Sequence, residues 1–435
     1  MAESIRLGIL GLGTVGTGVV QLVNEHQSEL QHQTGSNVEV TRVLVSDINK
    51  ERGAELEGVT LTESYEEVVT ADDVDIVIEV MGGIDHTLEV MKEAFKNGKH
   101  VVTANKDLLA LHGTELHEAA AANDCDLYYE ASVAGGIPIL SGLKSGLSSD
   151  RITKMMGIVN GTTNFILSKM KDEGRTYEDV LKEAQDLGFA ESDPAADVDG
   201  LDAARKMAIL GTLGFSMNID LEDVDTAGIR NVTLEDMTYA DRLGYTLKLI
   251  GLAERGADGV HISVEPLFVP ADHPLAAVKN EYNAVYVHGE AVGETMFYGP
   301  GAGSLPTATA VVSDLITVIK NVRLGVSGHD NVAAQHQKQL KPKSAITSKY
   351  YLRLHVADET GVFESITQKF AEEGISFEKI LQVPVEANGN GKAEIVLITH
   401  ETNGAAYEAL CQELNNLASV KELKSNYRVE GGQTA

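Results

Sequence analysis

The residues with the clearest chemical potential form one acidic segment, GFAESDPAADVDGLDAARK, which runs from Gly188 to Lys206. It holds five carboxylic acids and then two basic side chains: Glu191, Asp193, Asp197, Asp199 and Asp202, followed by Arg205 and Lys206. An EF-hand calcium loop needs D-x-[DN]-x-[DN]-G and a later Glu, and the segment has only a fragment of that pattern. Calcium binding is therefore the least favoured of its possible uses.

Asp202 and Lys206 lie four residues apart at the start of a helix expected over 202–213. This spacing puts both side chains on one helical face. They could form a salt bridge worth about 0.3–0.5 kcal/mol. Alternatively, a buried carboxylate could hold an ammonium group beside a reacting oxygen, where that group donates a proton and stabilises developing negative charge.

A second candidate site is the dinucleotide-binding motif GLGTVG, whose residues are Gly11, Leu12, Gly13, Thr14, Val15 and Gly16. It follows an apolar strand and opens a helix, the context in which such glycines bring a pyrophosphate to a helix N-terminus. Asp47, at the end of the expected second strand, could bind a ribose 2′-hydroxyl and favour NAD. Arg42, Lys50 and Arg52 could instead accommodate the 2′-phosphate of NADP.

Two further motifs follow later strands of the same expected sheet. Lys106 comes just after a strand that ends at Thr103. Ligands of open α/β sheets bind outside the carboxyl ends of the strands, so Lys106 would lie beside a nicotinamide; an exposed lysine at a helix start is the alternative. Glu130 begins EASVAGGI, where one acid and several turn carbonyls would suit a hard cation. A plain turn into the next domain is the alternative there.

The elements that must position these residues alternate between strand and helix over the first 130 residues. Strands are expected over 4–10, 38–45, 75–80, 100–103 and 126–129, with helices over 15–30, 86–97 and 107–123. This order predicts βαβ units and a Rossmann-type parallel sheet.

The middle region mixes strands with longer helices, which predicts an α+β substrate and dimerisation domain. Its expected strands are 152–159, 260–269 and 283–292, and its expected helices are 177–187, 202–213 and 237–255. A helix of small residues over 304–320 could pack back onto the first domain.

The last 80 or so residues predict a βαββαβ order, typical of a ferredoxin-like module. Its strands are expected over 350–356, 377–385, 393–399 and 420–429, and its helices over 361–373 and 405–417. A polar segment over 330–348 predicts a linker. The expected fold class is α/β, with domains at 1–130 (304–325 packing back on it), 131–303 and 349–432.

Composition limits the classes of partner. A chain of 435 residues suggests about three domains. The net charge of −30 argues against a nucleic-acid partner. No run of about 18 apolar residues and no secretory signal is apparent, so no membrane partner is expected. Cys125 and Cys411 lie far apart, which fits a reducing cytoplasm better than a disulfide scaffold.

The motifs GLGTVG, TANKDL, EASVAGGIPI, GIVNGTTNFIL, GFAESDPAADVDGLDAARK and GPGAGSLPTA, in this order, resemble those of homoserine dehydrogenases. The C-terminal module, with DETGVF at 358–363, resembles an ACT domain, as in the single-function form of the enzyme. The resemblance implies the NAD(P)H-dependent interconversion of L-aspartate 4-semialdehyde and L-homoserine, in the biosynthesis of threonine, methionine and isoleucine.

The resemblance also implies roles for residues, listed here by function. The implied catalytic residues are Lys206, which is the proton donor, Asp202, and Lys106, which contacts substrate and cofactor. Around the substrate these are Glu191, Asp197 and Asp202. Around the cofactor they include Thr103, Lys106, Gly188 and Gly303, besides the glycine motif and Asp47. Around a monovalent cation, usually sodium, these are Glu130, Val133, Gly135 and Ile137. Asp193 and Asp199 receive no role.

The resemblance further implies a homodimer or homotetramer and a threonine effector, although the ACT-like module could serve dimerisation alone. A non-catalytic amino-acid sensor that keeps the dinucleotide fold is an alternative function, but it would be favoured by loss of Lys206 or Asp202, and both are present. An acylating semialdehyde dehydrogenase would need a nucleophilic cysteine in the middle domain, where neither Cys125 nor Cys411 lies.

Overall fold

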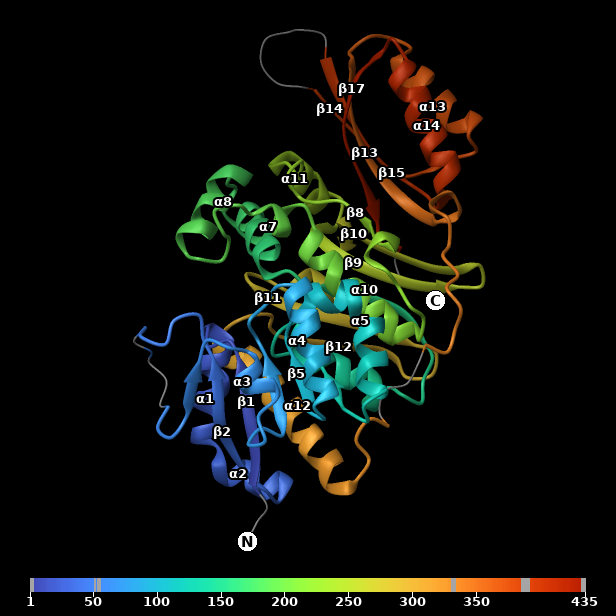
Figure 1. The fold of residues 1–435 in the computed structure, drawn as a ribbon. Coiled ribbons are helices and arrows are strands. Elements are labelled where there is room, and N and C mark those ends of the chain that lie inside the picture. The colour runs from blue at the N-terminus through green and yellow to red at the C-terminus, as the bar shows by residue number, and fades with distance from the viewer. Residues whose placement is uncertain (1–3, 51, 53–55, 330–333, 385–391, 432–435) are drawn as a thin grey trace. The chain divides into compact units, whose positions relative to one another are not determined.

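Six parallel strands form the sheet at the N-terminal end of the chain in the computed structural model, which describes residues 4–50, 52, 56–329, 334–384 and 392–431 (Figure 1). The strand order is β3-β2-β1-β4-β5-β6, and every pair is parallel. Their bounds are β1 Ser4–Leu10, β2 Asn37–Leu44, β3 Thr60–Thr62, β4 Ile76–Glu79, β5 His100–Thr103 and β6 Leu127–Tyr128. This is the Rossmann order, so the predicted parallel sheet is confirmed.

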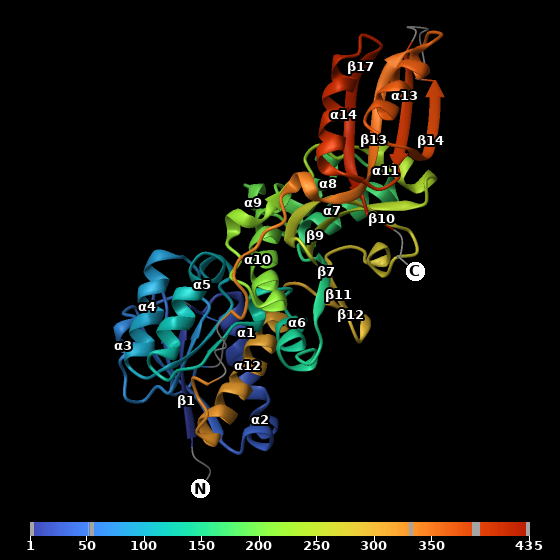
Figure 2. The same ribbon diagram turned by 90° about the vertical axis from the view of Figure 1, so that its right-hand side faces the viewer.

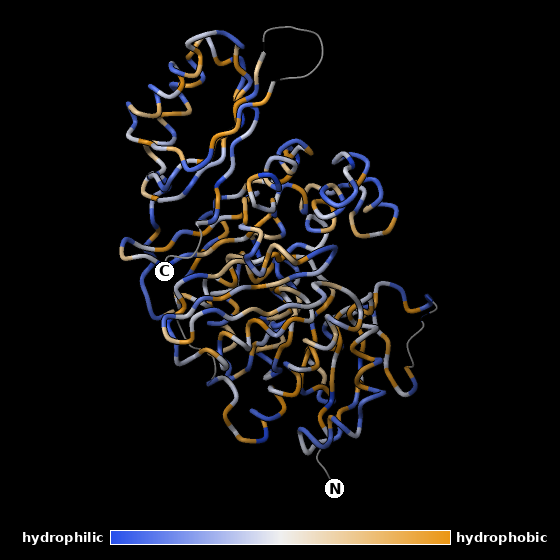
Figure 3. The backbone as a smooth tube through the Cα atoms, turned by 180° about the vertical axis from the view of Figure 1, so that it is seen from behind, coloured by the Kyte–Doolittle hydropathy of each residue, from blue (hydrophilic) through white to orange (hydrophobic). Residues whose placement is uncertain are grey.

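The chain divides into two compact units. The first comprises Met1–Thr153, Arg205–Asp223 and Asn283–Lys338, and the second comprises Lys154–Ala204, Val224–Tyr282 and Gln339–Ala435. Coloured by hydropathy, the backbone shows hydrophilic residues at many of its outer turns and hydrophobic residues mostly in the interior (Figure 3).

The helices that accompany the first sheet connect its parallel strands. They are α1 Thr14–Glu25, α2 Gln27–Thr34, α3 Glu66–Val69, α4 Asp85–Lys96, α5 Lys106–Ala121 and α12 Ser304–Leu324. The single helix expected over 15–30 is instead two, because His26 between them leaves helical geometry at φ −109° and ψ 29°. The first unit also holds the short α6 (Ile139–Ser141), most of β11 (Tyr282–Gly289) and all of β12 (Gly293–Pro300).

Helix α12 belongs to the core of the first unit. Its residues Ala308, Val311 and Leu315 are fully buried in one cluster with Val19 of α1 and Ile9 of β1. Among the described residues, this helix alone is long and apolar enough to cross a membrane by length and composition, with a mean hydropathy of 1.2. Half of it is buried inside the protein, as in a core helix.

The second unit contains a sheet with the strand path β7-β9-β10-β17-β13-β15-β14. The bounds are β7 Ile152–Ile158, β9 Tyr245–Gly256, β10 Gly259–Pro270, β13 Thr347–Ala357, β14 Phe377–Pro384, β15 Lys392–Thr399 and β17 Val420–Val429. Its helices include α7 Gly161–Glu173, α8 Tyr177–Asp186, α9 Ala195–Val198 and α11 Leu234–Arg242. Helix α10 (Leu201–Phe215) begins in this unit and continues into the first.

The prediction of a helix over 237–255 was wrong. Helix α11 ends at Arg242, and the following residues form β9, which pairs antiparallel with β10 over all twelve of its residues. The first nine residues of β9, from Tyr245 to Ala253, are buried. The strand carries Thr246 and Lys248 between its apolar residues, and both are buried. An apolar stretch that continues directly from a helix is not told from more helix by its periodicity alone.

The C-terminal module has the predicted βαββαβ order. Helix α13 (Val362–Glu372) follows β13, and α14 (Gly404–Asn416) precedes β17. Both helices cover one face of the module's strands (Figure 2), and Leu352, Phe370 and Leu410 meet in the core between them. Of the expected linker over 330–348, the first four residues lie outside the described part, and the last two already belong to β13.

Candidate active site

The glycine motif forms the turn between β1 and α1 in the first unit. Gly11 adopts a φ of +100°, and a Cβ there would lie 2.8 Å from the Cα of Met81. A Cβ on Gly16 would collide with the carbonyl oxygen of Gly11. Gly13 caps α1 and has open space around it. The turn is tight where glycine is required and open at the helix N-terminus, so the residues fit a bound pyrophosphate.

The GPGAG motif reaches this turn from a distant part of the sequence. Gly303 caps α12 with a φ of +125°. The hydroxyl of the next residue, Ser304, donates a hydrogen bond of 2.6 Å to the carbonyl of Thr14. Sequence reasoning assigned Gly303 and Thr14 to one cofactor site, and the structure brings their segments together. Leu12 and Val15 of the same motif are partly buried beside the core.

A buried carboxylate that sequence reasoning missed lies at the carboxyl end of β4. The Glu79 side chain is fully buried and accepts hydrogen bonds from the backbone N–H groups of Met81 (2.9 Å) and Gly82 (3.0 Å). Its other oxygen accepts the Thr103 hydroxyl at 2.6 Å. Burial raises the pKa of Glu79, and these donors oppose that rise. Glu79 thereby ties the loop after β4 to the end of β5.

Thr103 and Lys106 are connected through Asn105. The backbone N–H of Asn105 donates to the Thr103 hydroxyl at 3.0 Å, and its side chain caps α5 by accepting the Leu108 N–H at 3.1 Å. Lys106 is the first residue of that helix and is partly exposed. The structure therefore fixes the start of α5 relative to the β5 terminus, at the edge where the glycine turn also lies.

The candidate ribose-binding residue Asp47 lies in an exposed turn three residues beyond the end of β2. Its carboxylate accepts the backbone N–H of Asn49 at 2.8 Å. Of the nearby basic residues, Arg42 is paired with Asp73 at 2.6 Å, and the Arg52 guanidinium donates to the carbonyl oxygens of Lys50 and Asp47.

The acidic segment in the second unit forms a bridged pair of carboxylates. The Asn160 amide donates to Asp197 at 2.7 Å and to Asp202 at 2.8 Å. Asn160 is buried at the N-cap of α7, where its side-chain oxygen accepts the Thr163 N–H at 2.8 Å. Both roles of Asn160 were missed from the sequence, although it lies in the quoted motif GIVNGTTNFIL. Its signal was an N-cap asparagine directly after an apolar strand.

Helix α10 carries Asp202 in the second unit and Arg205 and Lys206 in the first. Both candidate catalytic side chains are buried, Asp202 with 5% and Lys206 with 9% exposure. Burial argues against the surface salt bridge that was the alternative for this pair. Arg205 forms an ion pair with Asp107 of α5 at 2.8 Å, which holds the helix to the segment that follows Lys106.

The remaining residues of the acidic segment differ in their surroundings. Glu191 and Asp193 are exposed in the turn after α8, and Gly188 in the same turn adopts a φ of +78°. Asp199 pairs with Arg230 through both of its oxygens, and this pairing lowers the pKa of Asp199. The structure thus gives Asp199 a partner, which the sequence did not.

The expected cation site is a buried turn in the first unit. The Glu130 carboxylate accepts the backbone N–H groups of Leu140 and Ser141, each at 2.7 Å. Val133 and Ile137 are buried, and Gly135 follows Ala134 in left-handed geometry, at φ values of +57° and +56°. Among the described residues no group of three or more His, Cys, Asp or Glu side chains could hold a metal, so any cation here would be bound mainly by carbonyl oxygens.

The two cysteines have the properties of structural thiols. Burial raises the pKa of Cys125 to about 11, and burial also raises the pKa of Cys411. A thiol with a raised pKa is a poor nucleophile at neutral pH. This agrees with the exclusion of an acylating mechanism.

Comparisons with known proteins agree along the whole chain. Family models match the NAD-binding domain of homoserine dehydrogenase at residues 11–130, homoserine dehydrogenase at 138–316 and the ACT domain at 350–419. The homoserine dehydrogenase of Bacillus subtilis is 58% identical to this chain, and the match covers 99% of both chains. That of Synechocystis is 41% identical, and the match covers 98% of this chain and 99% of the relative. The crystal structure of a homoserine dehydrogenase from Thiobacillus denitrificans, 39% identical, superposes with a TM-score of 0.93 and covers 99% of both chains.

These relatives match the chain from end to end. The matched length includes the parallel sheet with its glycine turn, the bridged carboxylates and the buried lysine. The NAD(P)-dependent oxidoreductase assignment and the ACT domain predicted from the sequence are confirmed. The chain belongs to the homoserine dehydrogenase family, whose members are NAD(P)-dependent oxidoreductases acting on CH–OH groups.

Proposed function

We propose that the side chains on α10 and its neighbours carry out the reduction of L-aspartate 4-semialdehyde to L-homoserine and its reversal. The observation that best supports this is the buried pair Asp202 and Lys206 on one helix, with Asp202 held by Asn160. The substrate carries an ammonium group, and a bridged pair of carboxylates suits it. Asp197 and Asp202 bind that group, and Glu191 joins them.

Lys206 acts at the carbonyl oxygen. When bound, the nicotinamide would supply a hydride to the aldehyde carbon, which would leave negative charge on the carbonyl oxygen. The ammonium group of Lys206 stabilises this charge and gives its proton to the oxygen, which yields the alcohol of homoserine. In the reverse direction the neutral amine accepts the proton. Asp202 positions Lys206 from one turn earlier on the helix.

The cofactor is NAD or NADP, bound by the glycine motif with Thr103, Lys106, Gly188 and Gly303. Lys106 contacts both substrate and nicotinamide. Asp47 favours NAD through its carboxylate, whereas Lys50 and Arg52 would favour NADP. The ratio of kcat/KM for NADH to that for NADPH, measured in the wild type and in Asp47→Ala, tests the role of Asp47. An unchanged ratio would show that Asp47 does not set the cofactor preference.

A monovalent cation, most simply sodium, occupies the turn formed by Glu130, Val133, Gly135 and Ile137. The buried carboxylate and the left-handed turn at Gly135 support this proposal. The midpoint of thermal unfolding should rise with sodium chloride more than with choline chloride at equal ionic strength. Equal midpoints in the two salts would contradict the cation site.

The enzyme is a cytoplasmic homodimer or homotetramer whose C-terminal module, at 349–432, binds threonine as a feedback effector. The substrate and dimerisation domain spans 131–303, the cofactor domain spans 1–130, and 330–348 serves as the linker. The presence of an ACT domain supports an amino-acid effector.

An assay of NADH and NADPH oxidation with L-aspartate 4-semialdehyde tests the reaction directly. Turnover with at least one cofactor is expected. No turnover with either would overturn the proposal.

A further inference from the structure

The residues next to the two candidate catalytic lysines form an ion pair with each other. Asp107 follows Lys106 in the first turn of α5, and Arg205 precedes Lys206 on α10. The Arg205 Nε lies 2.8 Å from an oxygen of the Asp107 carboxylate. All four residues belong to the first unit, in which Arg205 is the first residue of α10. The pair therefore joins the two helical segments that carry the lysines.

Each member of the pair depends on the other. In the described part of the chain neither side chain has another ion pair or hydrogen bond, and the Arg205 Nε is fully buried. Its N–H does not meet hydrogen-bond geometry, so the attraction is between the charges. The Arg205 and Asp107 side chains are 25% and 41% exposed, and ion pairs with such exposure contribute little to stability. The main consequence of this pair is therefore where the two helices lie.

A second set of contacts fixes the start of α5 to the first sheet. The Thr103 hydroxyl at the end of β5 donates to Glu79 at the end of β4, and it accepts the N–H of Asn105. The Asn105 side chain caps α5, and Asp107 lies two residues further on. The ion pair extends this series of contacts from the sheet that carries the glycine turn to the helix that carries Lys206.

The pair fixes the direction of the lysine side chains as well as the distance between the helices. Consecutive residues of an α-helix point about 100° apart around its axis. A contact made by Arg205 therefore sets the rotation of the turn from which Lys206 projects. Asp107 does the same for Lys106 in the first turn of α5. Such precision matters, because a misplacement of about 1 Å can lower a reaction rate about 10²-fold.

We propose that Asp107 and Arg205 are positioning residues for the reduction, and that their ion pair sets the distance between Lys106 and Lys206. The inference rests on the proposed function, in which Lys106 contacts the substrate and Lys206 protonates the carbonyl oxygen. Without the pair both lysines are present, but the proton donor is misaligned with the aldehyde. The kcat therefore falls. The KM for the cofactor changes little, because the glycine turn and the Glu79 contacts remain.

A local role of Asp107 is the alternative explanation. A carboxylate in the first turn of a helix stabilises that helix through the helix dipole, without any partner. In that case Asp107→Asn has the same effect whether or not Arg205 is present. If the ion pair is what matters, Asp107→Asn has no effect once Arg205 has been replaced. A double-mutant cycle separates the two explanations.

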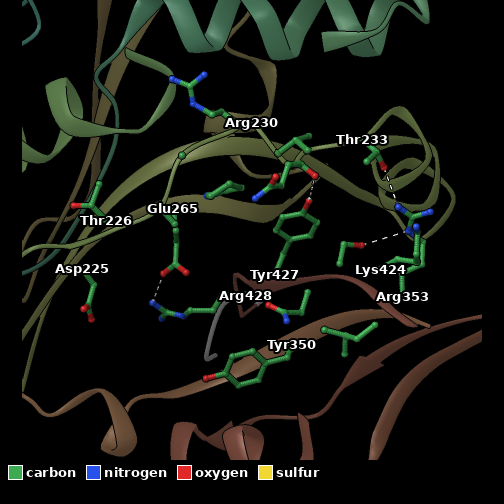
Figure 4. A pocket seen from close by; sticks show the side chains of 18 of the residues that line it. Asp225, Thr226, Arg230, Thr233, Glu265, Tyr350, Arg353, Lys424, Tyr427 and Arg428 are labelled. Atoms are coloured by element: carbon green, nitrogen blue, oxygen red, sulfur yellow. Dashed lines mark hydrogen bonds and ion pairs between the residues drawn. The ribbon is translucent and has the colours of Figure 1, made fainter. Parts of the chain in front are cut away.

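Two arginine–carboxylate pairs elsewhere provide matched controls. Arg6 and Asp75 pair at 2.7 Å at the amino ends of β1 and β4, opposite the edge with the glycine turn. Arg428 pairs with Glu265 at 2.9 Å in the second unit. This second pair lies at a cavity of about 1010 Å³, shown in Figure 4, whose described lining includes none of the candidate site residues.

Steady-state kinetics of the full-length chain with aspartate semialdehyde test the proposal. Asp107→Asn and Arg205→Met should each lower kcat about tenfold or more, and the double variant should lose no more than the larger single effect. Arg205→Lys should recover most of the activity, because a single nitrogen makes the contact. The controls Asp75→Asn and Glu265→Gln should keep the wild-type kcat.

The Lys206→Ala background shows whether the pair acts through the proton donor. Asp107→Asn should lower kcat no further in that background, and a further loss of the same size would overturn the proposal. Wild-type kcat in both single variants, or effects that multiply in the double variant, would also overturn it. These outcomes leave the proposed function intact. Absence of turnover in the wild type would instead overturn the proposed function itself.

Discussion

At the scale of single residues, the site depends on buried polar groups whose partners come from distant parts of the sequence. Glu79 and Asn160 show this most clearly, because each gathers several partners from two segments. Asp202 and Lys206 were predicted because their spacing and types are visible on one helix. Glu79 was not predicted as a site residue, because nothing in the segment DIVIEV distinguishes it from any other residue near the end of a strand.

Replacement of Lys206 with Ala should lower kcat by about 10²–10⁴-fold, the usual range for loss of a general acid. The KM for the cofactor should change less than twofold, because Lys206 acts at the carbonyl oxygen. Steady-state kinetics with aspartate semialdehyde measure both values. Lys182→Ala, an exposed lysine on α8, is the matched control. A Lys206→Ala enzyme with near-normal kcat would refute the assignment of the proton donor.

Replacement of Glu79 with Ala should lower the free energy of unfolding by about 1–3 kcal/mol, because buried N–H and O–H donors lose their acceptor. The same change should raise the KM for the cofactor, since Glu79 holds the loop after β4 and the β5 terminus. Urea unfolding and steady-state kinetics report the two effects. Glu89→Ala on the exposed face of α4 should change neither. A cofactor KM equal to that of the wild type would show that Glu79 is only structural.

At the scale of elements, the sequence predicts well where its periodicity is unambiguous. The parallel strands of the first sheet and the βαββαβ order were predicted because short apolar runs alternate with amphipathic helices. The prediction failed at β9, whose run YTLKLIGLA is buried on both faces. It also missed β12 (GETMFYGP), in which two glycines and a proline weaken the strand signal. Pairing with a neighbouring strand decides such cases, and the sequence does not display it.

A buried histidine on β10, beside its pairing with β17, predicts that the stability of the protein depends on pH. The imidazole of His261 is 6% exposed and lies 3.2 Å from the Arg428 guanidinium. Burial, followed by the charge of Arg428, lowers the pKa of His261 to about 4. Between its ordinary value of about 6.5 and pH 4, the unfolded chain binds a proton that the folded chain does not. Stability is therefore lost as the pH falls through this window.

His261→Gln should remove this contribution, because glutamine keeps an acceptor for Arg428 and does not titrate. When the pH falls from 7 to 4.5, the free energy of unfolding of the variant should rise by about 2–3 kcal/mol relative to that of the wild type. Denaturant titrations at both pH values measure it. His32→Gln, at an exposed position on α2, should show no such change. A difference that is constant with pH would contradict the neutral, buried state of His261.

At the scale of the whole molecule, the ACT module is part of the second unit and shares its sheet. Strand β17 pairs with Leu267 and Phe268 of β10, and the Glu430 N–H donates to the Phe268 carbonyl at 2.8 Å. Lys154 of β7 contacts Glu430 at 2.5 Å. The sequence predicted the module but placed a linker before it, because strand pairing between distant segments leaves no local pattern.

A chain that ends at Ala345 should therefore lose stability as well as regulation. Its β10 edge would expose Phe268, which is fully buried, and Asp236 would lose the Arg353 partner that it has at 2.8 Å. An exposed apolar strand edge also favours aggregation. We expect a thermal midpoint several degrees lower and a larger soluble-aggregate fraction in gel filtration. Arg353→Met in the full-length chain breaks the same ion pair while keeping the module, and should lower the midpoint less. A truncated chain with an unchanged midpoint would mean that the shared sheet contributes little, and that the module serves regulation alone.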